Sequence, residues 1–373
     1  MSKRKEPEGI RLQRLEITNF KAIDHLILDF PPPRMDTDPD IMVLGSKNGV
    51  GKTSILESCV LLQLAARSSE KALRSVDFVE RPISIPEVFI RSGKIKAVIR
   101  GEFGINGQNA PITLTLERSG LIKIDPDHQL FKKVSSAPRF DEMDSLEKLS
   151  SFVSGNSVEP IIIEPMVYFH SYRKVQEGNP ELGMMVDPER VYRRMAFQRM
   201  RRPGGEGRVI SLFKLQILRA MMGQANLFEG LDDAPEEPND PRNTLPTLNG
   251  LIERYAGGTI ERLRPSPDNT VEFRIKPKSG GESYSFDGLS SGQKEIISTL
   301  FLIWHYTRKK PGIVLIDEPE LHLNAEWHRD FVRQVFQLAP DNQYILATHS
   351  EDIFASVDED RRLMLSQSAD PAP

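Results

Sequence analysis

Apolar positions near the start of the chain fall into two short β-like runs, at 14–20 and 25–30, joined by a polar turn. The next apolar run, at 41–45, is compact enough for a buried strand. A glycine-rich segment follows it, and residues 55–67 then carry the apolar spacing of a helix. This pattern predicts a strand, a glycine loop and a helix, the order that a phosphate-binding loop requires.

The middle of the chain has a β-like region followed by a mostly helical one. Three β-like segments between 94 and 124 are separated by short polar turns, which predicts an antiparallel meander. The apolar run at 160–170 predicts one further buried strand. Residues 188–264 are mostly helical in pattern, with breaks at 201–207 and in the acidic, proline-rich loop 231–246.

From about residue 265 the pattern returns to alternating strands and helices. A β-like segment at 271–276 precedes a helical run at 294–306, and the apolar run at 313–316 predicts a buried strand. A helix at 325–338 and a strand at 343–348 complete this part of the chain. Such alternation predicts an α/β fold with a parallel sheet.

Composition and charge limit the class of protein that the chain can be. With 39% hydrophobic and 27% charged residues, the chain has ordinary globular composition. No apolar run approaches the ~20 residues that span a bilayer, and no secretory signal opens the sequence, so we expect no membrane contact. The single cysteine, Cys59, excludes an internal disulfide and favours the cytoplasm, and its apolar surroundings favour a buried structural thiol. The net charge of −4 means that nucleic acid could be bound only through a local basic patch.

The glycine-rich segment SKNGVGKTS, at 46–54, is the first candidate site. Its backbone N–H groups and the start of the following helix can surround phosphate oxygens. A lysine in this position supplies charge to the β and γ phosphates, and the hydroxyl after it can bind Mg²⁺. Ser46 stands where the strict pattern has glycine, and a glycine turn beside a chance lysine is the alternative. The residues that we expect to contact ATP are Asn48, Gly49, Gly51, Lys52, Thr53 and Ser54, with Thr53 also a metal ligand.

Two carboxylates follow the apolar run at 313–316. In open α/β sheets the carboxyl ends of the strands face the ligand, so Asp317 and Glu318 would enter that crevice. One carboxylate can belong to the Mg²⁺ shell, which we assign to Asp317, and the next can deprotonate an attacking water, which we assign to Glu318. Alone, this pair could equally be an ordinary strand end.

The segment LSSGQ, at 289–293, precedes the helical run. A serine hydroxyl and free N–H groups at a helix start form an anion site, although a serine–glycine turn that only caps the helix is the alternative. The predicted strand at 343–348 is followed by His349, which taken by itself could be structural. Ser290, Gly292 and His349 are therefore further candidate site residues.

Together with the opening segment LEITNFK at 15–21, these four motifs resemble the RecF/SMC/OLD branch of ABC ATPases. The resemblance covers roughly 11–175 and 265–355. It implies an ABC-type P-loop NTPase, with two ATPase lobes, an antiparallel β subdomain and a helical insertion. The expected parts are lobe I at 1–180, the insertion at 181–264, and lobe II at 265–373.

The resemblance also implies the chemistry. ATP and Mg²⁺ would be the cofactors, Glu318 would be the catalytic base, and His349 would contact the γ-phosphate. Ser290 and Gly292 would meet the ATP held by a second copy, giving a homodimer, with a higher oligomer left open. Either Gln176 or Arg173 would act as the γ-phosphate sensor of the Q-loop, and we also assign Gln176 to the ATP and Mg²⁺ contacts. The D-loop would be 320–324, with Asn324 where many members have aspartate.

The segment DEPELHL, at 317–323, is most similar to the corresponding segment of OLD-type and related defence ATPases. OLD proteins carry a nuclease domain after the ATPase, and SMC proteins carry long coiled coils; the sequence shows neither pattern. We therefore expect a sensor or regulator subunit that acts with a separate effector, such as a nuclease or toxin, in defence or DNA maintenance.

Two rival functions remain. A RecF-like repair ATPase would bind DNA directly, and a cluster of arginines at 190–208 could grip a phosphate backbone. The same arginines could dock an acidic partner protein or form a solvated helix face. The ATPase subunit of a membrane transporter would have its phosphate loop and signature much closer together than Lys52 and Leu289 are here.

Overall fold

The computed structural model describes two compact units, one made of 1–173 and 306–373 and the other of 174–305. The residues described are 9–365 without 36–37, 47–48, 68–72, 74–84, 126–147, 150–151, 153–158, 182–210, 224–242, 262, 266 and 268. Asn48 and the arginine cluster at 190–208 therefore lie outside the described residues. The division at 180 and 264 into lobes and insertion stays a prediction.

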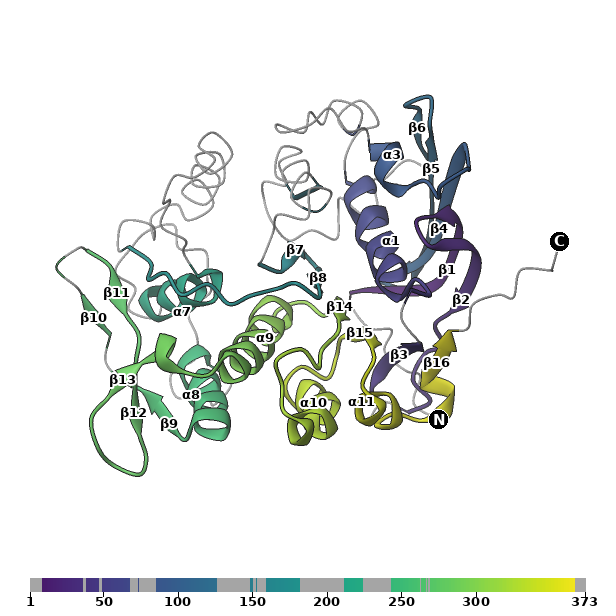
Figure 1. Cartoon of the computed structure of the whole chain (residues 1–373). Coiled ribbons are helices and arrows are strands. Elements are labelled where there is room, and N and C mark those ends of the chain that lie inside the picture. The colour runs from purple at the N-terminus through teal and green to yellow at the C-terminus, as the bar shows by residue number, and fades with distance from the viewer. Residues whose placement is uncertain are drawn as a thin grey trace. The chain divides into compact units, whose positions relative to one another are not determined.

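The first unit contains a six-stranded sheet in the order β16-β3-β15-β14-β8-β7 (Figure 1). All pairs are parallel except β7 with β8, so β3, β14 and β15 end at the same edge of the sheet. The predicted buried strands at 41–45, 313–316 and 343–348 are confirmed. The strands are β3 (Asp40–Ser46), β7 (Ile161–Ile163), β8 (Met166–Phe169), β14 (Ile313–Asp317), β15 (Gln343–Thr348) and β16 (Arg362–Leu365).

A second sheet of the same unit is antiparallel, in the order β2-β1-β4-β5-β6. Its last three strands are consecutive in the chain, which confirms the predicted meander. Along β4 and β5 buried and more exposed residues alternate, as expected for a sheet that is covered on one face. The strands are β1 (Ile10–Phe20), β2 (Ile23–Asp29), β4 (Lys96–Ile105), β5 (Gln108–Glu117) and β6 (Ile122–Asp125).

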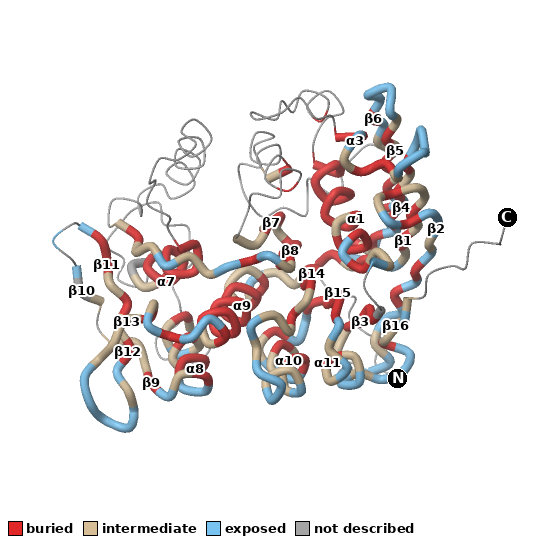
Figure 2. The backbone as a smooth tube through the Cα atoms, viewed as in Figure 1, coloured by how far each residue is buried: buried red, intermediate tan, exposed pale blue. Residues whose placement is uncertain are grey.

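The helix α1 (Lys52–Ala65) contacts strands of both sheets. Almost all of its residues are buried, as Figure 2 shows, which explains why its sequence is apolar on nearly every side. Cys59 is 2% exposed, and burial raises the pKa of its thiol to about 12. The predicted buried structural thiol agrees with this position.

The run at 160–170 forms two strands rather than the single one that its apolar pattern predicted. β7 and β8 pair antiparallel around Glu164 and Pro165, because the proline has no N–H with which to continue a ladder. The carbonyl of Pro165 instead accepts a hydrogen bond of 3.0 Å from the N–H of Ile313 at the start of β14. A Cβ at Gly312 would lie 1.6 Å from that carbonyl oxygen, so only glycine fits there.

The remaining elements of the first unit surround these sheets. α10 (Ala325–Leu338) has the predicted bounds, and Asn324 caps it by accepting a hydrogen bond of 2.9 Å from the N–H of Trp327. The other short helices are α3 (Ile85–Phe89), α11 (Glu351–Ala355) and η3 (Glu359–Arg361). Among the described residues, no helix has both the length and the apolar character needed to cross a bilayer.

The second unit is built from helices and short strands. An aromatic cluster forms part of its core, with the ring of Phe213 5.1 Å from that of Phe286 and 5.4 Å from that of Phe301. These rings come from α7, η2 and α9, so the three elements pack together. The elements are α7 (Leu212–Gly223), α8 (Thr244–Ala256), β9 (Gly258–Ile260), β10 (Arg264–Pro265), β11 (Val271–Glu272), β12 (Arg274–Pro277), β13 (Tyr284–Ser285), η2 (Phe286–Gly288) and α9 (Ser291–Thr307).

Candidate functional site

The glycine loop leads from β3 into α1. Gly51 has a φ of 100° and stands directly before the helix, and a Cβ there would lie 3.0 Å from Cγ1 of Ile23. Gly49 has a φ of 84°, so both positions favour glycine for backbone reasons. The N–H groups in the first turn of a helix have no partner within it and therefore favour an anion. Thr53 is exposed in this turn and Ser54 is buried.

Lys52, the first residue of α1, is only 6% exposed. Its Nζ lies 2.9 Å from Nε2 of His349, which follows β15. Burial lowers the pKa of the lysine, while the nearby carboxylates of Asp317, Glu318 and Glu320 oppose that shift. The predicted phosphate-loop cation and the predicted switch histidine are thus brought together.

Asp317 ends β14 and is 1% exposed. Its Oδ2 accepts a hydrogen bond of 2.8 Å from Oγ1 of Thr53, whereas Oδ1 is buried and has no hydrogen-bond partner. Burial is the main reason that the pKa of this carboxyl is raised, to about 6, and the bond from Thr53 opposes the shift. A buried carboxylate oxygen without a partner, beside a hydroxyl, fits a hard cation such as Mg²⁺.

These two side chains are a small ligand set. No group of three or more His, Cys, Asp or Glu side chains that could hold a metal occurs within the described part of the chain. Mg²⁺ bound with a nucleotide commonly takes only one or two protein ligands, because phosphate oxygens and water supply the rest. Thr53 and Asp317 therefore fit that arrangement.

Glu318 continues the chain beyond β14 in a left-handed conformation, with a φ of 49°. Its N–H donates a 2.7 Å hydrogen bond to the carbonyl of Ala347 in β15. The carboxylate is 30% exposed, and its Oε1 lies 3.8 Å from Nε2 of His349. Glu318 is thus held by its backbone while its side chain stays accessible, which suits a group that must reach a water molecule.

Glu320 is a residue whose contribution the sequence did not reveal, since it was assigned only to the D-loop. Its Oε2 accepts a hydrogen bond of 2.7 Å from Oγ1 of Thr348, and its Oε1 accepts one of 2.6 Å from the N–H of His349. The carboxylate therefore fixes the backbone that carries His349. Its place two residues after Glu318 was the only signal in the sequence.

Arg173 is 5% exposed and lies in the same unit as the phosphate loop. Its guanidinium donates hydrogen bonds of 2.7 Å to the carbonyl of Asp317 and 3.2 Å to that of Glu318. The side chain thereby holds the end of β14. Gln176 lies in the second unit, where its Nε2 is 3.5 Å from the carbonyl of Lys174. A contact of either residue with the γ-phosphate, and of Gln176 with Mg²⁺, stays a prediction.

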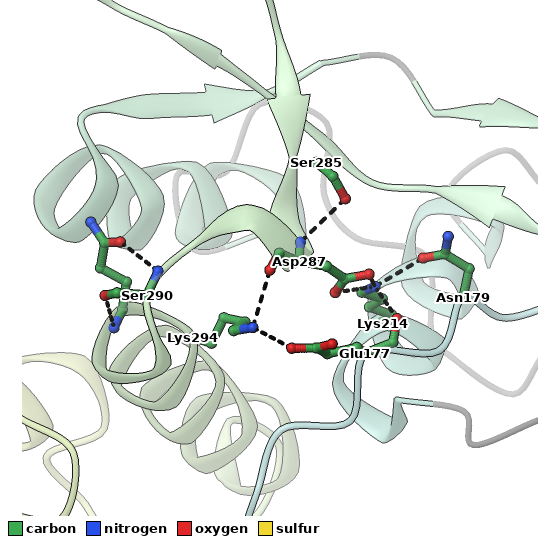
Figure 3. Close-up of polar contacts among 8 residues, drawn as sticks. Glu177, Asn179, Lys214, Ser285, Asp287, Ser290 and Lys294 are labelled. Atoms are coloured by element: carbon green, nitrogen blue, oxygen red, sulfur yellow. Dashed lines mark hydrogen bonds and ion pairs between the residues drawn. The ribbon is translucent and has the colours of Figure 1, made fainter.

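The predicted signature lies in the second unit, where Ser290 caps α9 (Figure 3). The N–H of Ser290 donates a 3.0 Å hydrogen bond to Oε1 of Gln293, and the N–H of Gln293 donates one of 3.2 Å to Oγ of Ser290. This reciprocal pair is a capping box. Ser290 is exposed and Gly292 is buried in the first turn of the helix.

A strand, a glycine loop and a helix, with an aspartate that ends a parallel strand of the same sheet and a glutamate directly after it, define the class as a P-loop NTPase fold, and the solved structures reported below make it the ABC type. Residues 47–355 match the family model described as "AAA domain, putative AbiEii toxin, Type IV TA system". The chain belongs to this family.

Three curated proteins are similar to the chain. The Septu protein PtuA of Bacillus mycoides (strain KBAB4) is 27% identical, over 91% of this chain and 38% of PtuA. The Retron Vc95 probable ATPase of Vibrio cholerae serotype O1 biovar El Tor is 31% identical, over 24% of this chain and 19% of that protein. The Retron Ec83 probable ATPase of Escherichia coli is 20% identical, over 95% of this chain and 71% of that protein. The chain thus spans well under half the length of the first two relatives.

Solved structures agree with this class. The Smc head bound to the C-terminal winged-helix domain of ScpA matches with a TM-score of 0.51 and 15% identity, covering 93% of this chain and 92% of that one. A second match is the Smc head with an extended coiled coil, bound to the C-terminal domain of ScpA derived from Pyrococcus furiosus. Its TM-score is also 0.51, with 14% identity, and it covers 94% of this chain and 92% of that one. At this identity the matches establish the fold alone.

Proposed function

We propose that the chain binds Mg²⁺ and ATP and hydrolyses ATP to ADP and phosphate. The observation that carries this proposal is the convergence of Lys52, Asp317 and His349 from distant parts of the chain. Lys52 contacts His349 at 2.9 Å, and Thr53 beside it contacts Asp317 at 2.8 Å. A lysine and a hydroxyl in the first turn of one helix, beside a buried carboxylate that ends a strand, are the groups that a nucleoside triphosphate and its metal need.

Each residue has a separate role in the proposed reaction. Lys52 and the backbone of the glycine loop bind the phosphates, and His349 lies where it can contact the γ-phosphate. Thr53 and Asp317 would hold Mg²⁺, which when bound neutralises charge on the β- and γ-phosphates. Glu318 orients the attacking water and accepts its proton, and the backbone hydrogen bond to Ala347 keeps it beside His349.

Replacing Glu318 by glutamine tests this assignment. Because an amide cannot accept the proton, turnover should fall by ~10²–10⁴-fold, while ATP binding remains. The measurements are steady-state ATPase rates and the affinity for ATP. Glu359→Gln is the matched control, since that side chain is 92% exposed and should leave turnover unchanged. Turnover of Glu318→Gln within threefold of wild type would contradict the proposal.

We further propose that two copies share each ATP. Ser290 and Gly292 belong to the second unit, at the start of α9, and would meet the γ-phosphate held by Lys52 of the other copy. The exposed Ser290 hydroxyl and the start of α9 suit an anion. ATP would then stabilise the closed homodimer more than ADP does, because ADP lacks the γ-phosphate that both copies contact.

The proposed setting is anti-phage defence in the cytoplasm, with a separate effector such as a nuclease or toxin. The Septu and retron names of the relatives support this setting, and the arginine-rich segment 190–208 offers a contact for nucleic acid or an acidic partner protein. Phage plating on cells that carry the gene with its neighbours tests it. Glu318→Gln should remove protection while Glu359→Gln keeps it; equal protection by both variants would contradict a role for hydrolysis in defence.

A further inference from the structure

A buried lysine lies beside the signature in the second unit. The side chain of Lys214, on α7, is 1% exposed, and its Nζ is surrounded by oxygen atoms (Figure 3). It donates hydrogen bonds of 2.6 and 2.7 Å to the two carboxylate oxygens of Asp287, 2.9 Å to Oδ1 of Asn179 and 3.0 Å to the carbonyl of Glu177. An ammonium group is buried only where such partners offset its loss of water. Nothing in the proposed catalytic reaction uses this lysine.

Asp287 links that lysine to the signature. It belongs to the short helix η2 (Phe286–Gly288), which directly precedes Leu289 and Ser290. The N–H of Asp287 also donates a 3.3 Å hydrogen bond to Oγ of Ser285, so the turn is held at its backbone as well as at its side chain. The orientation of Asp287 therefore sets the direction in which the chain enters α9.

A second lysine bridges the same two residues. Lys294, in the first turn of α9, donates a 2.6 Å hydrogen bond to Oε1 of Glu177 and a 3.1 Å hydrogen bond to the carbonyl of Asp287. The bond from Lys294 is the main reason that the pKa of Glu177 is lowered. Both lysines thus connect the turn before the signature to the segment at 177–179, and the side chain of Lys214 is the more deeply buried, at 1% exposed against 11% for Lys294.

The packing around Lys214 keeps its neighbours in place without its charge. The ring of Phe213 contacts that of Phe286, which directly precedes Asp287, and that of Phe301, which lies within α9. Methionine at 214 would retain most of the apolar volume and remove only the ammonium group. The aromatic core would then hold α7 and α9, while the Asp287 carboxylate would be left without its buried cation and would turn towards water.

We propose that Lys214 is a positioning residue for the signature: through Asp287 it fixes the turn that presents Ser290 to the γ-phosphate bound by a second copy. This inference rests on the proposed shared ATP site. A displacement of about 1 Å in a group that must meet a reacting phosphate can cost ~10²-fold in rate. The effect of losing Lys214 should therefore appear in turnover rather than in the affinity of a chain for ATP.

The experiment combines a single variant with mixtures of inactive variants. Lys214→Met should lower kcat by ~10–10²-fold and leave ATP affinity within about twofold. Lys276→Met is the matched control, because Lys276 is an exposed lysine of the same unit and should keep wild-type turnover. Lys214→Arg retains the charge and should recover part of the lost kcat, which a role in core packing alone would not give, since arginine is the larger side chain.

Mixing locates the defect. Lys52→Ala damages the phosphate loop and Ser290→Arg the signature, so in their mixed dimer one shared site carries both defects and the other carries none. A signature-side defect at Lys214 predicts that Lys214→Met regains turnover when mixed with Lys52→Ala but not with Ser290→Arg. The reverse pattern would mean that Lys214 acts on its own phosphate loop, and recovery with neither would mean a general loss of structure; both overturn the inference.

Two controls separate this result from the proposed function. If the Lys52→Ala and Ser290→Arg mixture recovers nothing although the subunits exchange and a single intact site is shown to be active, the shared site is wrong and the inference fails with it. If that mixture recovers and the Lys214→Met mixtures do not follow the Ser290→Arg pattern, only the inference fails. Should Lys214→Met not fold, by circular dichroism, Asp287→Asn replaces it in the same mixtures. The inference requires Asp287→Asn to show the same pattern.

Discussion

At the scale of single residues, burial determines what the charged groups of the site can do. Asp317 and Glu318 are neighbours in the chain, yet Asp317 is 1% exposed and Glu318 has a side chain 30% exposed. The buried carboxylate holds one hydrogen bond from Thr53 and one oxygen without a partner, which suits a metal ligand. The accessible one suits proton transfer to or from water. Two adjacent carboxylates thus differ in role because their environments differ.

His170 gives a prediction that concerns stability and not turnover. Its ring is buried, its Nε2 lies 3.1 Å from the carbonyl of Glu159, and burial lowers its pKa from 6.5 to about 4. The unfolded chain therefore binds a proton at higher pH than the folded chain, so stability present above about pH 6.5 is lost as the pH falls towards 4. The loss should be about 3 kcal/mol.

Urea unfolding at pH 7 and pH 4.5, compared between wild type and His170→Gln, measures this loss. The comparison is needed because Asp317, whose pKa is raised to about 6, acts in the opposite direction over the same range. Wild type should lose more stability between the two pH values than the variant. An equal loss in both proteins would contradict the assignment to His170.

At the scale of elements, the sequence predicted those parts of the fold that depend on local pattern. The alternation in β4 and β5, the bounds of α10 and the cap at Ser290 follow from neighbouring residues. The proximity of Lys52 to His349 was also predictable, because strands that are parallel end at the same edge. The family resemblance supplied their roles.

What the sequence could not reveal are contacts that depend on tertiary packing alone. The approach of the Pro165 carbonyl to Gly312 and its hydrogen bond from the N–H of Ile313 join segments that lie far apart in the chain. Arg173 was considered only as a γ-phosphate sensor, and nothing near it in the sequence shows that it binds the carbonyls of Asp317 and Glu318. Lys214 and Asp287 lie far apart in the chain, and no spacing rule connects them.

The end of β14 supplies a prediction at this scale. Arg173→Met removes the hydrogen bonds to the carbonyls of His170, Asp317 and Glu318, and a buried carbonyl left without its partner costs ~1–3 kcal/mol; the Asp317–Glu318 turn should then move. We expect a lower melting temperature and a fall in kcat of at least tenfold, with ATP still bound through Lys52. Thermal unfolding and steady-state rates measure both. Arg100→Met is the control, since that arginine is 57% exposed and, among the described residues, pairs only with Glu16 at 3.3 Å; unchanged kcat in Arg173→Met would contradict this role.

At the scale of the whole molecule, the phosphate loop and the signature belong to different compact units. A site completed by a second copy makes ATP binding and assembly one equilibrium, since a ligand shifts an equilibrium only through its different affinity for the two states. The hydrolysis-deficient Glu318→Gln variant should therefore accumulate as a dimer in ATP and return to monomer in ADP. Light scattering after size exclusion measures this.

Lys52→Ala provides the comparison for that experiment. Without the phosphate-binding cation it should bind ATP weakly and stay monomeric in either nucleotide. A dimer of Glu318→Gln that is equally stable in ATP, in ADP and without nucleotide would show that ATP does not drive association, although it would leave the hydrolytic assignment intact.

The burial of Cys59 has a practical consequence for measuring the association of two copies. The only cysteine of the chain is 2% exposed, with a thiol pKa of about 12, so it contains almost no thiolate at neutral pH and should resist maleimide dyes. The wild-type sequence can therefore receive one added cysteine as a selective attachment point for a fluorophore. A dye on a cysteine placed at Gly288, which is exposed directly before the signature and has open space for a Cβ, would report the approach of a second copy in real time without any cysteine having to be removed first.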